Sequence, residues 1–124
     1  MKRSAIKTRG KHARSESKTL RENTPYLAER AGGEWLGWHS LEGTHALGVK
    51  CEICSRHLPD VIGFRAHIDE RRSEADDNIW NIIIACPDCH NHDKYPDGGL
   101  RCGTEEAKRI VRERNEAHGI GREQ

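Results

Sequence analysis

Two Cys-x-x-Cys pairs, Cys51 with Cys54 and Cys86 with Cys89, restrict the folds open to this chain more than any other feature. A gap of two residues lets one turn of backbone present both sulfur atoms of a pair to the same ion, and Zn²⁺ favours four thiolates in a closed tetrahedron. In a reducing compartment such paired spacings favour a metal over disulfides. The four cysteines therefore predict a structural zinc site that closes across the two pairs.

The composition is typical of a small domain that needs such a site. Of the 124 residues, 34% are hydrophobic and 33% are charged, so the apolar core is modest and metal binding would contribute to folding. No apolar run approaches the roughly 18 residues of a membrane-spanning helix, and no signal-peptide pattern is present. We expect a cytosolic protein without a membrane partner. The fifth cysteine, Cys102, is expected to be a partly buried free thiol.

Residues 1–24 form a basic segment, although the formal net charge of the whole chain is only +1. The segment has eight Lys or Arg residues against two acidic residues, and few large apolar side chains. It cannot bury enough surface to fold alone, so we expect a disordered arm that contacts nucleic-acid phosphate without reading sequence. A tail that only improves solubility is the alternative.

Residues 25–50 are expected to form a short helix and a tryptophan-containing lead-in to the metal region. Pro25 suits the first position of a helix, and the glycines that follow predict its end, which gives a helix over about residues 25–31. Trp35 and Trp38 are expected to cover the zinc core, with base stacking as the alternative.

The central block, residues 51–95, predicts a strand, a polar loop, a second strand and a helix. The β-branched and aromatic content of residues 61–68 indicates a strand that ends near His67, and residues 81–86 indicate a second strand paired with it. Pro87 is placed to open a helix. That helix would carry Cys89, His90 and His92.

Residues 96–124 are expected to be a connector followed by a C-terminal helix. Thr104 is a capping residue with acids after it, which predicts a helix from Glu105 to about His118. A narrow apolar stripe would pack this helix against the core. The stripe consists of Ala107, Ile110 and Val111.

Three segments of the central block, Ala66–Ile68, Asp76–Asn81 and Asn81–His90, resemble the signature of HNH endonucleases, in the subgroup stabilised by a four-cysteine zinc. The resemblance covers about residues 51–95. It implies an α+β fold, a small zinc-stabilised ββα-metal domain with flanking helices and the basic arm. The bare architecture is similar to phage-encoded or mobile-element nucleases, which would act in a host cytoplasm.

The resemblance also implies roles for three residues. His67 would be the general base, because imidazole titrates near working pH. Asn81 would orient the His67 loop by hydrogen bonding, and His90 would bind a catalytic Mg²⁺ or another divalent ion, distinct from the structural zinc. His92 is the reserve candidate for this last role.

One position departs from the family pattern. Many members carry an acidic residue or a second histidine just before the first histidine, where this chain has Ala66. The second protein ligand of the catalytic ion is therefore open among Asp69, Asp88 and Asp93.

The sequence thus predicts a metal-dependent HNH endonuclease that hydrolyses DNA phosphodiester bonds, by nicking or by double-strand cleavage. The alternative is a non-catalytic zinc-stabilised module that binds nucleic acid through its arm, and a third interpretation is a zinc-stabilised protein interaction domain. The sequence predicts neither a base preference nor an oligomeric state.

Overall fold

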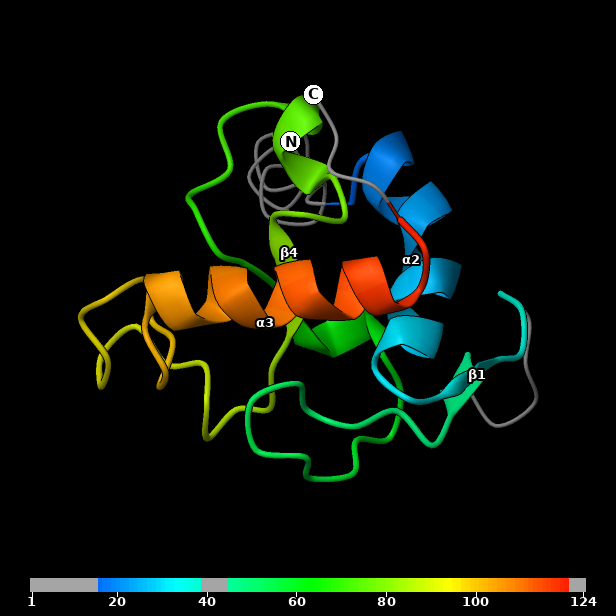
Figure 1. Cartoon of the computed structure of the whole chain (residues 1–124), viewed down its shortest axis with the longest axis horizontal. Coiled ribbons are helices and arrows are strands. Elements are labelled where there is room, and N and C mark those ends of the chain that lie inside the picture. The colour runs from blue at the N-terminus through cyan, green and yellow to red at the C-terminus, as the bar shows by residue number, and fades with distance from the viewer. Residues whose placement is uncertain (1–15, 39–44, 121–124) are drawn as a thin grey trace, which may run out of the picture.

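The computed structural model describes residues 16–38 and 45–120 (Figure 1). Two helices, α2 (Lys18–Arg30) and α3 (Thr104–Ala117), pack with two small antiparallel sheets. One sheet pairs β1 (Glu34–Trp35) with β2 (Ala46–Leu47), and the other pairs β3 (Arg65–His67) with β4 (Ile82–Ile84). Two 3₁₀ helices, η2 (Ile62–Phe64) and η3 (Glu74–Asp77), lie on either side of β3 in the chain.

The fold is therefore mixed α and β, as the sequence predicts in outline. In the view of Figure 1, α3 crosses the front of the molecule and α2 lies at its right. Across residues 16–38 and 45–120, no helix is both long enough and apolar enough to span a membrane.

The pairing of β3 with β4 confirms the two predicted strands of the central block. The antiparallel register places Arg65 opposite Ile84 and His67 opposite Ile82. The first strand is shorter than the predicted residues 61–68, because residues 62–64 form η2 instead. All three isoleucines of β4 are buried, so this strand runs through the core and fixes the position of β3.

Helix α2 begins well before the predicted start at Pro25. Ser17 caps it, accepting a hydrogen bond from the backbone N–H of Leu20 at 3.0 Å. Pro25 lies inside the helix, where it removes one backbone hydrogen bond. Burial of Leu20 and Leu27 compensates for that loss. The expectation of a disordered arm over residues 1–24 is therefore wrong from Lys18 onward, while residues 1–15 lie outside the described part of the chain.

The two tryptophans of the lead-in behave differently. Trp35 packs against the buried core, as predicted. Trp38 contacts Trp35 edge to face, with ring centroids 4.9 Å apart, and the guanidinium of Arg21 lies 3.9 Å from its ring centre. Trp38 therefore links the lead-in to α2 through a cation–π contact.

The helix predicted after Pro87 does not form, and residues 87–99 make successive turns. The side chain of Asn91 accepts hydrogen bonds from the backbone N–H groups of Asp93 and Lys94, which bends the chain away from a helix. The backbone N–H of Asn91 then bonds to the carbonyl of Gly99 at 2.7 Å, and Gly99 has a φ of +72°. His90 therefore forms an isolated antiparallel bridge with Leu100, His92 lies on a turn, and a ββα unit is not confirmed.

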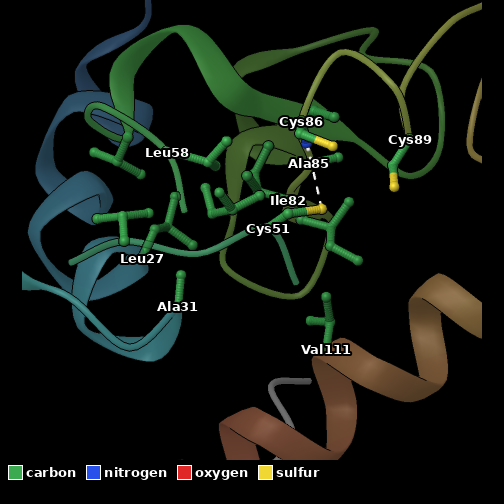
Figure 2. Close-up of a cluster of buried hydrophobic side chains, with 14 of the residues drawn as sticks. Leu27, Ala31, Cys51, Leu58, Ile82, Ala85, Cys86, Cys89 and Val111 are labelled. Carbon is green, nitrogen blue, oxygen red and sulfur yellow. Dashed lines mark hydrogen bonds between the residues drawn. The ribbon is translucent and has the colours of Figure 1, made fainter. Parts of the chain in front are cut away.

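The next helix is α3, close to its predicted bounds. Asp97 satisfies its first turn by accepting hydrogen bonds from the backbone N–H of Thr104 at 3.1 Å and from its hydroxyl at 3.0 Å. Ala107 and Val111 are fully buried and Ile110 is partly buried, so the predicted apolar stripe is confirmed. Figure 2 shows Val111 directed into the same core as Leu27 of α2.

A buried ion pair joins the two helices to the metal region. Arg30 at the end of α2 donates to both carboxylate oxygens of Glu52, at 2.7 and 2.8 Å, and neither side chain is exposed. Arg30 also donates to the carbonyl of Ile82 at 2.6 Å, and more weakly to Asn115 of α3 at 3.3 Å. Glu52 lies between Cys51 and Cys54. The Arg30–Glu52 ion pair therefore ties the first cysteine pair to both helices and to β4.

Removing one partner of this pair should destabilise the protein strongly. Glu52→Ala would leave Arg30 charged, buried and without its carboxylate, which typically costs about 3–5 kcal/mol in the free energy of unfolding. Urea unfolding of the metal-loaded protein measures the change. The control, Glu113→Ala, removes an exposed ion pair with Arg109 on α3 and should cost less than about 1 kcal/mol. Equal stability of the two variants would contradict the role assigned to the pair.

Candidate functional site

The four paired cysteines converge. Their sulfur atoms all lie within 4.8 Å of one another, and Cys54 Sγ lies 3.6 Å from Cys86 Sγ. Tetrahedral zinc with Zn–S bonds of about 2.3 Å would place its sulfur ligands roughly 3.8 Å apart. The cluster could therefore hold a metal ion such as zinc, and the predicted closure of the two pairs onto one point is confirmed.

Backbone N–H groups and burial set the electrostatics of this cluster. Cys51 Sγ accepts hydrogen bonds at 3.4 Å from three backbone N–H groups, and the one from Cys86 is the dashed line in Figure 2. The backbone N–H of Arg56 lowers the pKa of Cys54 to about 7, whereas burial raises the pKa of Cys86 and of Cys89. Closely spaced thiolates repel one another, and a divalent cation offsets that repulsion. The donor set suits a thiolate-binding ion.

The fifth cysteine, Cys102, is a partly buried free thiol, as predicted. It is not part of the four-cysteine cluster, and burial raises its pKa.

A cavity of about 620 Å³ brings three histidines together. His67 comes from β3, whereas His90 and His92 come from the non-helical segment directly after the second cysteine pair. The rings of His90 and His92 meet edge to face, with centroids 5.1 Å apart. Arg71 also lines the cavity. The two imidazoles that the sequence predicts to act together thus face one solvent-open space, and His92 joins them.

A buried carboxylate orients His67. Asp77 in η3 is fully buried, and its Oδ1 lies 2.6 Å from Nε2 of His67. Burial would raise the pKa of Asp77, but hydrogen bonds from His67 and Ser17 and the charge of Arg71 outweigh it and hold that pKa below its usual value. An ionised carboxylate only accepts hydrogen bonds, so Nε2 of His67 must carry the proton. A neutral imidazole with its proton on Nε2 has its lone pair on Nδ1, and that nitrogen is the one that can take a proton.

Asn81 fastens the loop between the two strands. Its side-chain oxygen accepts from the backbone N–H of Asp69 at 2.9 Å, and its NH₂ group donates to the carbonyls of Asp69 at 3.1 Å and Asp76 at 2.8 Å. These contacts hold both ends of the segment that runs from β3 to η3. Since η3 carries Asp77, Asn81 positions His67 indirectly, and no reaction step has to involve it.

None of the three acids considered for the second ion ligand reaches the cavity. Asp69 is near Lys108 at 3.3 Å, Asp88 pairs with Arg56 at 2.7 Å, and Asp93 is exposed.

Ala66, where the family pattern places an acid, is buried and lines the cavity. Apart from the cysteines, no group of three or more His, Cys, Asp or Glu ligand atoms converges within residues 16–38 and 45–120. Burial lowers the pKa of His90, and the charges of His92 and His67 lower it further, which favours the neutral imidazole. A metal takes that form of the ring.

The sequence motif assigns no role to two residues of this site. They are Asp77, which holds His67, and Ser17, which donates to Oδ2 of Asp77. The pattern Ser73-x-x-Asp76 is a capping box that predicts the turn presenting Asp77. No local pattern connects Ser17 to Asp77, because they lie far apart in the chain.

No model of a known protein family matches this chain, no curated protein matches it, and no solved structure matches it. The resemblance to HNH endonucleases therefore depends on the motif residues alone.

The four-cysteine cluster leads to a prediction about metal content. Purified protein should contain a single tightly bound zinc ion, and Cys86→Ser should lose it together with cooperative unfolding, because a structural metal site contributes its binding energy to folding. Elemental analysis and thermal unfolding measure the two effects. Cys102→Ser is the matched control, since this thiol is outside the cluster, and it should keep the ion. Full metal content in Cys86→Ser would contradict the assignment.

Proposed function

We propose that this protein is a metal-dependent nuclease that hydrolyses DNA phosphodiester bonds, by nicking or by double-strand cleavage, with His67 as general base. The observation that carries the proposal is the shared cavity of His67 and His90, in which Asp77 leaves Nδ1 of His67 free to take a proton. The four-cysteine cluster serves as the scaffold, with zinc as its ion.

His67 is suited to activate water. Its side chain is 24% exposed, so one edge of the ring reaches the cavity while Asp77 holds the other edge. When Nδ1 takes a proton from water, the resulting imidazolium is stabilised by the buried carboxylate beside it. Asn81 keeps that carboxylate in register by holding the loop.

His90, with His92 as its neighbour, would hold a divalent ion such as Mg²⁺. Such an ion, when bound, neutralises charge on the scissile phosphate and on the leaving oxygen. The lowered pKa of His90 keeps its ring available as a ligand. Because no acid completes this set in the described residues, the substrate phosphate and water would supply the other ligands.

A non-catalytic nucleic-acid-binding module is the second candidate. One observation favours it: Ala66 stands where an acidic ion ligand is expected, and in the described part of the chain no group of three His, Cys, Asp or Glu ligand atoms forms around His90. Such a module would retard DNA in a gel without cutting it.

Plasmid nicking separates these two functions. With Mg²⁺ or Mn²⁺ the protein should convert supercoiled DNA to the open circle, and His67→Ala should reduce the rate about 100- to 10,000-fold, because it removes the general base. Its zinc content should not change. His57→Ala is the matched control, since His57 is exposed and does not line the cavity, and it should cut at the rate of the unchanged protein.

Shifted DNA mobility without any cutting would contradict the nuclease and favour the binding module. Equal rates for His67→Ala and His57→Ala would instead remove His67 from the mechanism.

The basic segment gives a prediction about DNA affinity. Deleting residues 2–14 removes six Lys or Arg residues and leaves Ser17, the cap of α2, in place. We expect weaker DNA binding and a shallower dependence of the dissociation constant on salt, because fewer phosphate counterions are released. Fluorescence anisotropy at several salt concentrations measures both. Unchanged affinity and slope would show that the segment does not contact DNA.

A further inference from the structure

We propose that Arg71 is the phosphate-binding side chain of the histidine cavity and contacts the phosphodiester next to His67. This inference rests on the proposed function and names how the same site holds its substrate.

One buried carboxylate places Arg71 beside the base. Nε of Arg71 donates to Oδ2 of Asp77 at 3.0 Å, while Oδ1 of the same carboxylate holds Nε2 of His67 at 2.6 Å. Asp77 is itself fixed by its complete burial and by the hydroxyl of Ser17. The guanidinium and the imidazole are therefore held next to each other by a single rigid group.

The outer part of the Arg71 guanidinium is available for a ligand. The side chain is 29% exposed and lines the cavity, and within residues 16–38 and 45–120 its two terminal nitrogens make no hydrogen bond. The other arginine of the cavity, Arg65, is engaged by Glu16, by Thr24 and by the carbonyl of Ile62.

The charge of the cavity wall favours an anion. The lining has two arginines, Arg65 and Arg71, against one acidic residue, Glu70, whose side chain is 80% exposed. A guanidinium with a fixed Nε still offers two N–H groups in one plane, which match two oxygens of a phosphate. A phosphodiester bound there would lie within reach of the adjacent base.

Neighbouring arginines allow a matched test. Arg71→Ala removes the proposed contact, and Arg71→Lys keeps a cation near Asp77 but loses the planar pair of N–H groups. Arg72→Ala removes the same charge from the next position, where the side chain is 80% exposed and lies 3.6 Å from Glu70. Zinc content and thermal unfolding of each variant show whether it is folded.

Two readouts are needed. The first is the plasmid-nicking rate, which should fall about 100- to 1,000-fold in Arg71→Ala, fall less in Arg71→Lys, and stay within about 3-fold in Arg72→Ala. The second requires no catalysis. The dinucleotide thymidylyl-thymidine is titrated into protein with labelled histidines, without added divalent ion. Saturable shifts of the His67 and His90 ring signals are expected, with a dissociation constant weakened about 10-fold or more in both Arg71 variants.

Equal binding by Arg71→Ala and Arg72→Ala would overturn the inference, and so would equal nicking rates in these two folded variants, while the nuclease would stand. If the unchanged protein binds the dinucleotide through Arg71 but never cuts DNA, the phosphate site is supported and the nuclease is contradicted. If Arg71→Ala does not fold, Arg71→Lys decides, and binding equal to that of the unchanged protein would overturn the inference.

Discussion

Glu52 lies inside the first cysteine pair, and its carboxylate receives two hydrogen bonds from Arg30 with no exposure to solvent. Burying two charges carries a large desolvation penalty, which is offset only when nearly every polar atom has a partner. Here Oε1 of Glu52 also accepts from the backbone N–H of Ile84, and Arg30 donates to two backbone carbonyls, those of Ile79 and Ile82. The first cysteine pair is thereby locked to β4 and to the end of α2, and the rest of the fold is arranged around this point.

The positions of His67 and His90 depend on this buried ion pair and the strand that it holds. β4 is held by the ion pair and is buried along its whole length, and β3 pairs with it residue by residue, so His67 inherits its place from the core. The second cysteine pair follows β4 directly and presents His90 to the same cavity. The proposed site is therefore held in two ways, through the pairing of β3 with β4 and through the four-cysteine cluster.

The features that the sequence predicts correctly are those set by residues close together in the chain. The features that it does not predict depend on contacts between residues far apart in the chain. Three predictions are confirmed because each depends on a short sequence pattern. They are the convergence of the cysteine pairs, the pairing of the two strands and the apolar stripe of α3. The predicted start of α2 is wrong. Proline is common at the first position of a helix, but here Pro25 lies inside α2, where packing of the helix against the core tolerates it. The prediction of a helix after Pro87 is wrong because the side chain of Asn91 accepts hydrogen bonds from the next backbone N–H groups and holds the chain in a turn. Arg30 and Glu52 look like surface charges in a sequence this polar, so their burial was not predictable.

Asp77 shows why the candidate site is more than its motif residues. Its carboxylate takes hydrogen bonds from β3, from the loop after β3 and from the cap of α2, through His67, Arg71 and Ser17 respectively. A group with this many donors stays ionised and rigid, and it sets the tautomer of one neighbour and the orientation of the other. Because Ser17 is also the cap of α2, a change in the first turn of that helix would reach His67 through Asp77.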